Sequence, residues 1–274
     1  MEDFTRATAI RVRELGFSGV FTRFRANDPC ETTASQCRRL RRLLEDEGIQ
    51  MYQATGYWQP LIHPDEKTRR QAVRTLQEAL KVASFFGARS IDTGPGSLNP
   101  RGPWFPHPYN WTATARTQLV KSLKECAGAA EEFGVYLCLE GHQLVTLDSS
   151  ETMRDVLAAV DSAWIRADYD PVNWITRETV FATGPAIQLA MATLGDWIVS
   201  AHAKDIVIDD RLILHLSECP PGRGLLDYRT FMLGMETLDP DFPVIVEATD
   251  ENELPEVSAF LHELAAELGI TIRG

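Results

Sequence analysis

Residues 131–142, EEFGVYLCLEGH, contain the pattern that decides the fold. A charged helix end is followed by Gly134, then by the apolar run 135–139, and this run ends on Glu140 and His142. Glycine tolerates the left-handed conformation that ends many helices. A short, continuous apolar run is typical of a strand buried on both faces of a parallel sheet. The stretch therefore predicts a helix, a turn and a buried strand that ends on two polar side chains.

The same unit of helix end, glycine and strand recurs along the chain. It is found as ELGFSGVF at Gly16, DEGIQMYQ at Gly48, FFGARSID at Gly87 and ELGITI at Gly269. Segments with the 3.6-residue period of amphipathic helices are expected at about 33–46, 66–86, 114–133, 150–160, 185–194, 228–238 and 254–268. Strands are expected at 19–24, 49–55, 88–94, 135–141, 164–170, 197–203 and 242–248. Strands that alternate with helices indicate a parallel sheet.

This alternation favours an α/β fold of the TIM (β/α)8 type, with residues 1–274 forming a single domain. A doubly wound open sheet is the alternative, but no GxGxxG motif follows the first expected strand. An eightfold barrel needs one strand more than the seven that the pattern supplies. We therefore expect the first strand of the barrel to be missing, or to be replaced by the strand-like C-terminal segment 270-ITIR-273.

Composition narrows the classes of partner. The formal net charge of −12 would repel a nucleic-acid backbone, so no nucleic acid is expected. No apolar run reaches the roughly 20 residues that span a membrane, and the N-terminus has no signal-peptide core. The five cysteines, Cys30, Cys37, Cys126, Cys138 and Cys219, form no CxxC pair. We expect free thiols and a cytoplasmic protein without a membrane partner.

Polar residues stand where four successive strands end. Glu140 ends the strand at 135–141, and Glu247 ends the last strand. His202 and Lys204 lie at the end of the strand in 197-WIVSAHAKD-205. In a TIM barrel these ends share one rim, where catalytic groups gather. The strand 164-WIRADYD-170 offers Asp168 or Asp170, which alternation places on one face; Asp170 lies nearer the end and is preferred. Glu140, Asp170, His202 and Glu247 together predict a site for a hard divalent cation.

Two long loops on the same rim predict a binding site for a small molecule. They are 56-GYWQPLIHPD-65 and 94-GPGSLNPRGPWFPHPYNWT-112. Their aromatic residues could cover a sugar, or could pack the loop on itself or on a second subunit: Tyr57, Trp58, Trp104, Phe105 and Trp111. Side chains that could meet its hydroxyl groups are His63, Arg101, His107, Asn173, Lys204 and Arg223. His142 could contact the metal shell, the substrate or only solvent.

From Thr5 to Leu268 the chain resembles the xylose-isomerase-like TIM-barrel family of sugar isomerases and epimerases. The similar pieces are CLEGH, DPVNW, SAHAKDI, the turn GRGLLDY and VIVEA. The resemblance implies that Glu140, Asp170, His202 and Glu247 bind one divalent ion, with Mn²⁺ favoured over Mg²⁺, Co²⁺ or Zn²⁺. It also implies that Glu140 and Glu247 move a proton, as in ketose 3-epimerases, and that the protein forms an oligomer.

The sequence departs from the 3-epimerases at Asn173, where those members often have a histidine, and asparagine cannot change protonation. The EGH triplet is also similar to dehydratases and to subunits that cleave 3-keto C-glycosides. The family also includes DNA-repair endonucleases with a histidine-rich site for three metal ions. The six histidines scattered over this acidic chain argue against membership of that branch.

The resulting hypothesis is a metal-dependent isomerase or epimerase of carbohydrate metabolism. Glu140, Glu247 or His142 would remove a proton beside the carbonyl of a keto-sugar or related polyol, through an enediolate. A lyase that uses the same first step is the alternative. A sugar-binding barrel without catalysis, or one subunit of a hetero-oligomer, is a further alternative to a homo-oligomeric enzyme.

Overall fold

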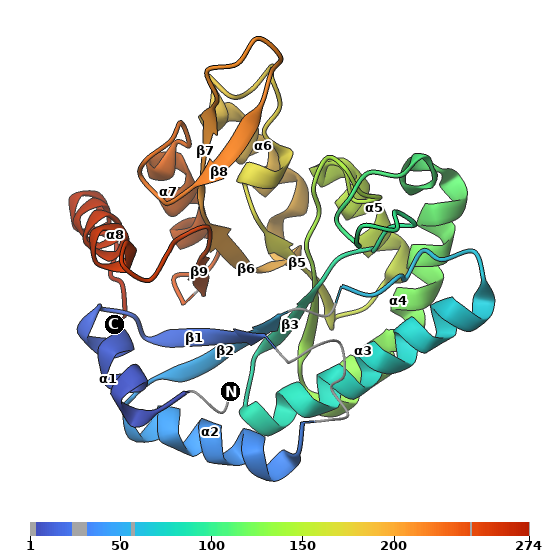
Figure 1. The fold of residues 1–274 in the computed structure, drawn as a ribbon, viewed down its shortest axis with the longest axis horizontal. Coiled ribbons are helices and arrows are strands. Elements are labelled where there is room, and N and C mark those ends of the chain that lie inside the picture. Colours follow the sequence, from blue (N-terminus) through green and yellow to red (C-terminus); the bar gives the residue numbers. More distant parts are fainter. Residues whose placement is uncertain (1–3, 24–31, 56–57, 242, 274) are drawn as a thin grey trace.

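The structure is a computed structural model that describes residues 4–23, 32–55, 58–241 and 243–273. Seven parallel strands form one curved sheet in the order β1-β2-β3-β4-β5-β6-β9 (Figure 1). They are β1 (Gly19–Arg23), β2 (Gln50–Thr55), β3 (Ser90–Thr93), β4 (Tyr136–Leu139), β5 (Ile165–Tyr169), β6 (Ile198–Ala203) and β9 (Val244–Val246). All seven strands expected from the sequence are present, and the α/β TIM-barrel fold is confirmed.

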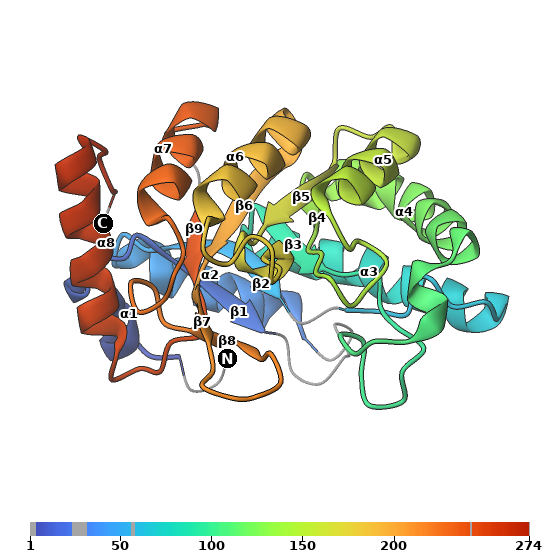
Figure 2. The same cartoon turned by 90° about the horizontal axis from the view of Figure 1, so that it is seen from above.

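Helices cover the outside of the sheet and follow one another around it, as the view from above shows (Figure 2). They are α1 (Arg6–Glu14), α2 (Ala34–Asp46), α3 (Glu66–Phe86), α4 (Ala113–Phe133), α5 (Ser150–Val160), α6 (Thr183–Leu194), α7 (Tyr228–Leu238) and α8 (Leu254–Leu268). Three of these helices are capped by Asp65, Ser149 and Asp227, and each of these side chains accepts the backbone N–H of the residue three positions later. No helix among the described residues is long and apolar enough to cross a membrane.

Among the described residues no strand joins β9 to β1, so the barrel is open there. Of the two alternatives expected for the first strand, replacement by the C-terminal segment is wrong. The backbone N–H of Ile270 donates to Ala265 O at 2.9 Å and so ends α8. Residues 271–273 form no strand, and Arg273 pairs with Asp241 at 2.5 Å. A cleft of about 370 Å³ therefore remains between the two edge strands, and the segment lines it without pairing.

A β-hairpin, β7 (Asp205–Ile208) with β8 (Leu216–Cys219), follows β6 directly and projects beyond the barrel (Figure 1). The carboxylate of Asp205 anchors its base by accepting backbone N–H groups from Ile206, Gly222, Gly224 and Leu226, at 2.8–3.1 Å. A Cβ at position 224 would lie 2.3 Å from Asp205 Oδ1, so this close approach requires glycine. The GRGLLDY turn is thus built around one buried carboxylate.

Alternation along the strands gives the barrel a polar interior. Residues 90, 92, 138, 140, 168, 170, 200, 202 and 204 lie in the strands or directly after them, follow one another at intervals of two and are buried, and most are polar. The apolar core instead packs between sheet and helices, with Leu137, Leu139, Ile165 and Ile198 among its members. The cysteines Cys37, Cys126, Cys138 and Cys219 are free thiols, while Cys30 and Tyr57 lie outside the described residues.

Candidate metal centre

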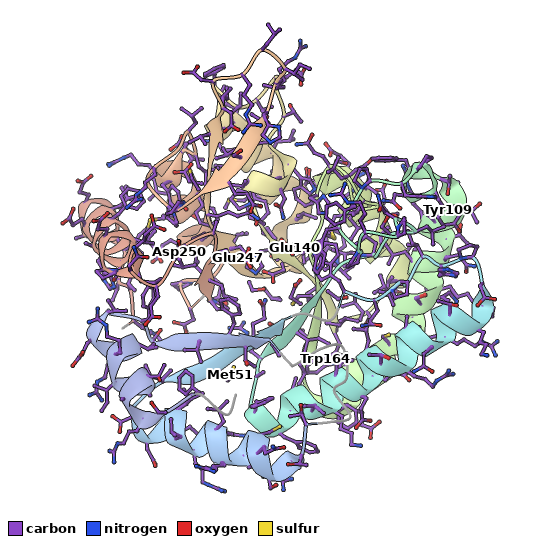
Figure 3. All side chains as sticks on the ribbon, in the orientation of Figure 1. Met51, Tyr109, Glu140, Trp164, Glu247 and Asp250 are labelled. Atoms are coloured by element: carbon purple, nitrogen blue, oxygen red, sulfur yellow. The ribbon has the colours of Figure 1, made fainter. Side chains whose placement is uncertain are left out.

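Four of the predicted side chains meet at the carboxyl ends of the strands. Glu140 follows β4, Asp170 follows β5, His202 lies in β6 and Glu247 follows β9. Each offers one ligand atom, and these atoms lie within 4.8 Å of one another. Figure 3 shows Glu140 and Glu247 reaching the middle of the barrel from different parts of the sheet. Strands far apart in sequence therefore bring three carboxylates and one imidazole to a single point.

His202 directs one ring nitrogen at the three carboxylates. Its Nδ1 lies 3.7 Å from Glu140 Oε1, 3.9 Å from Asp170 Oδ2 and 3.4 Å from Glu247 Oε2. Its Nε2 lies 3.1 Å from Asp168 Oδ2. When Nε2–H donates to Asp168, the lone pair of the neutral ring is on Nδ1, which is the arrangement of a metal-binding histidine.

Asp168, the alternative to Asp170 in the sequence, lies behind His202 and outside the four-residue cluster. It is buried, and its carboxylate accepts from Ser200 Oγ at 2.7 Å and from Gln53 Nε2. Three donors thus converge on one carboxylate, which fixes both its position and that of the imidazole. The preference for Asp170 agrees with this geometry because only Asp170 faces the cluster.

The cluster has the properties of a cation site. Among the described residues, His202 Nδ1 is one of the buried side-chain polar atoms that lack a hydrogen-bond partner. It faces Asp170 Oδ2, whose printed partner is the Lys204 ammonium at 2.8 Å. Buried polar atoms are normally satisfied, so an open ring nitrogen that faces three carboxylates indicates a site for a ligand. Carboxylate oxygens with one imidazole nitrogen suit Mn²⁺, Mg²⁺, Co²⁺ or Zn²⁺. The residues present therefore fit a divalent metal ion.

The pKa values reflect the crowding of carboxylates. Burial alone would lower the pKa of His202, but the charge of Asp168 and hydrogen bonds to the carboxylates raise it well above its ordinary value. Burial raises the pKa of Asp170 to about 6, although the nearby Lys204 ammonium opposes the shift. Negative charge is thus concentrated where solvent cannot disperse it, and a bound cation would relieve it.

A cavity of about 620 Å³ opens above the cluster. Five predicted substrate or catalytic residues beyond the cluster line it: Trp58, Trp104, His142, Asn173 and Lys204. Apolar side chains from the segments after β4 and β5 and from the β7–β8 hairpin complete its wall, namely Leu144, Val172, Ile175, Ile206 and Leu216. This mixture of aromatic, aliphatic and a few polar groups is typical of small-molecule sites of this size.

Three of these residues are held in place by specific contacts. Asn173, in the short helix η3 (Val172–Trp174), donates from Nδ2 to Glu140 Oε1 at 2.7 Å and so orients that carboxylate. His142 Nδ1 accepts the backbone N–H of Leu144 at 3.2 Å, and burial lowers the pKa of its ring. Lys204 Nζ lies 2.8 Å from Asp170 Oδ2 and 2.7 Å from Glu218 Oε1 on the hairpin.

An aromatic wall forms one side of the cavity. Trp58 is 6% exposed, and its ring centroid lies 5.3 Å from that of Trp104 and 5.9 Å from that of His142. Its Nε1–H donates to Asp92 Oδ2 at 3.2 Å. A Cβ at position 94 would lie 2.1 Å from the Trp58 ring, so the glycine of 94-GPG-96 makes room for it.

Four of the predicted polar contacts do not line the cavity: His63, Arg101, His107 and Arg223. His63 Nδ1 accepts the N–H of Asp65 at 3.0 Å, at the start of α3. His107 Nδ1 accepts the N–H of Tyr109 at 3.2 Å, at the start of η2 (Pro108–Trp111). Arg223 is paired at 2.6 Å with both Glu253 and Glu256. The structure gives each of them a local structural role instead.

The loop 94–112 partly packs on itself. The guanidinium of Arg101 lies over the ring of Phe105, 4.6 Å from its centroid. Phe105 O accepts from Ser97 Oγ at 2.8 Å. Phe105 and Trp111 do not line the cavity, so only Trp104 of this loop's aromatic residues faces it.

Sequence reasoning missed Asp92 and Glu218, which both line the cavity. Asp92 lies in β3, two residues before Gly94, much as Glu140 lies directly before Gly141. This parallel was a usable signal, because every strand end of a barrel reaches the same rim. Glu218 lies in a hairpin strand that was not expected, and no pattern pointed to it.

The fold and the site define a TIM barrel with a candidate metal centre at the carboxyl ends of its strands. The family model described as xylose isomerase-like TIM barrel matches residues 10–267. The chain therefore belongs to the xylose isomerase-like TIM barrel family. Against curated proteins, the sequence has no significant match.

Solved structures share the fold at low identity. D-psicose 3-epimerase from Clostridium cellulolyticum H10, solved with D-tagatose, has a TM-score of 0.73 at 19% identity, over 96% of this chain and 93% of that chain. A xylose isomerase-like TIM barrel protein from Mycobacterium smegmatis, in complex with magnesium, has 0.68 at 18%, over 97% and 91%. The probable 3-DHS dehydratase AsbF from Bacillus anthracis has 0.70 at 16%, over 96% and 94%.

Proposed function

We propose that this protein is a divalent-metal-dependent sugar isomerase or epimerase that acts on a keto-sugar or related polyol. The observation that carries the proposal is the cluster of Glu140, Asp170, His202 and Glu247, whose ligand atoms lie within 4.8 Å of one another. The cavity above it has room for a small polyhydroxy compound. Epimerases among proteins of the same fold add support.

The four residues would hold one ion, for which we favour Mn²⁺. Similar folds that contain magnesium or zinc agree with a divalent ion at such a site. Such an ion, when bound, polarises a carbonyl group and stabilises negative charge that develops on its oxygen. His202 would contribute Nδ1, because its Nε2 is engaged with Asp168.

The chain's own residues would move the proton. A neutral imidazole that accepts at Nδ1 carries its proton on Nε2, so His142 is placed to donate a hydrogen bond and not to act as the base. Glu140 and Glu247 remain as candidates to take the proton from the carbon beside the carbonyl. Asn173 holds Oε1 of Glu140, which leaves the other oxygen for this role.

Returning the proton to the opposite face would give an epimer, and returning it to the neighbouring carbon would give an isomer. Loss of a leaving group instead would make the protein a lyase, the second candidate, which shares the first step. A dehydratase of similar fold supports the lyase as this second candidate. Product analysis by NMR separates these outcomes.

Exchange of substrate hydrogen with solvent deuterium tests the shared first step. The protein with added Mn²⁺ should incorporate deuterium into at least one keto-sugar, and metal removal should stop the exchange. The Glu140→Gln variant should lose it, because an amide cannot accept the proton. Asp155→Asn, an exposed change on α5, is the matched control. Exchange that persists in Glu140→Gln would contradict Glu140 as the base.

A further inference from the structure

The cavity carries more negative than positive charge. Glu140, Glu218 and Glu247 line it together with Asp92, whose pKa is raised well above its ordinary value by burial and by the nearby carboxylates. Lys204 is the only lysine or arginine among the described residues that lines the cavity. The Lys204 ammonium is already paired with Asp170 and Glu218. A phosphate group on a substrate would need a free cation or free N–H donors, and charges of like sign in a cavity repel.

One place where a TIM barrel commonly binds phosphate is occupied by the carboxylate of Asp205. Phosphate sites in this fold use backbone N–H groups of the loops after the last two strands. Here the N–H groups of Gly222, Gly224 and Leu226, which would form such an anion site, all donate to Asp205. Arg223 in the same turn is paired with Glu253, directly before α8, and with Glu256 in that helix.

Asp92 is the cavity residue with an unused polar atom. Its side chain is 4% exposed, and Oδ2 accepts from Trp58 Nε1. Its Oδ1 is buried and finds no hydrogen-bond partner in the part of the chain that the structure describes. An unsatisfied oxygen costs free energy unless a ligand satisfies it. A sugar hydroxyl beside the aromatic wall of Trp58 and Trp104 would provide the missing hydrogen bond.

We infer that the site takes an unphosphorylated sugar and that Asp92 Oδ1 hydrogen-bonds one of its hydroxyl groups. The inference rests on the proposed function for the position of the reacting carbon, but its binding part can be tested without catalysis. Asp92 would be a specificity-determining residue, because a hydroxyl of the wrong configuration would leave its oxygen unpaired.

Binding is measured by calorimetry with the Mn²⁺-loaded protein and with hexitols, which have no carbonyl group to react. We expect at least one hexitol to bind about tenfold or more tightly than its terminal phosphate ester. Asp92→Ala should weaken that hexitol by about tenfold. Asp92→Asn should lose less, because its amide can still bond a hydroxyl and Trp58 Nε1. The remote Asp155→Asn is the matched control.

Monodeoxy hexitols separate a direct contact from a structural role. The analogue that lacks the contacted hydroxyl should bind more weakly than the parent hexitol to the wild-type protein. To the Asp92→Ala variant, the analogue and the parent hexitol should bind equally well. If every deoxy penalty persists in Asp92→Ala, the contact is refuted. If the phosphate esters bind as tightly as the hexitols, the substrate class is refuted, whether or not keto-sugars exchange deuterium. Tight hexitol binding without any exchange would instead refute the proposed function alone.

Discussion

Replacing Asp168 should weaken metal binding although Asp168 does not face the ion. Its carboxylate holds Nε2 of His202 at 3.1 Å and is itself held by Ser200 and Gln53. Loss of such a supporting carboxylate typically reduces metal affinity by about 10- to 100-fold, which corresponds to ~1.4 to ~2.8 kcal/mol. Asp168→Asn keeps an acceptor for Nε2 but removes the charge, so we expect a loss near the lower end of this range.

Asp168→Ala should lie near the upper end, because Nε2 of the imidazole then keeps only its longer contact with Gln53 Oε1, at 3.4 Å, and the ring can turn away from the cluster. The three donors around position 168 would also be left in a buried site, so we expect Asp168→Ala to unfold more easily by about 2 kcal/mol. Both variants are therefore compared at a temperature where circular dichroism shows each to be folded.

The assay is a titration of the metal-free protein with Mn²⁺, followed by the paramagnetic signal of free Mn²⁺. Asp155→Asn, on the outer surface of α5, should bind as the wild-type protein does. Wild-type affinity in both Asp168 variants, with the fold intact, would refute the assignment of His202 Nδ1 as a ligand. A loss in Asp168→Ala with none in Asp168→Asn would show that orientation matters and charge does not.

Two further predictions concern the same site. Metal affinity should rise with pH between about pH 5 and pH 8, by up to about tenfold per pH unit for each proton displaced. The reason is that Asp170, whose pKa is about 6, and His202, whose pKa is raised well above its ordinary value, must lose protons to bind an ion. A Mn²⁺ titration in several buffers that shows no pH dependence would contradict this. Trp104→Ala should raise KM for the sugar about five- to tenfold through lost stacking, whereas Trp111→Ala, also an exposed tryptophan of the same loop but away from the cavity, should change it less than about twofold.

The cluster could be predicted from the sequence because strand geometry fixes where its side chains point. In a strand, residues two apart share a face, and parallel strands end at one rim. Glu140, Asp170 and His202 all obey this rule, and their ligand atoms do meet. Closure by the tail failed for a local reason: Gly269 and Ile270 complete the end of α8, so the chain has already turned away from the sheet edge.

The loop residues could not be placed in this way. His63, His107 and Arg223 occur in loops of suitable composition, but no period fixes the direction of a loop side chain. Each instead bonds the backbone or a carboxylate near it. Trp58 and Trp104 line the cavity and Trp111 does not, but no pattern in the sequence distinguishes Trp111 from the other two.

The polar interior explains why the stability of this barrel and its proposed chemistry are connected. TIM barrels usually fill their interior with bulky branched side chains. Here Gln53, Asp168 and Ser200 form a buried hydrogen-bonded layer directly beneath His202. Such a layer is favourable only when its groups are satisfied, and these are. The unsatisfied atoms, Asp92 Oδ1 and His202 Nδ1, lie one level higher, where the cavity begins. Because the satisfied layer holds the imidazole rigid, the open atoms above it stay aimed at the space that an ion and a sugar would share.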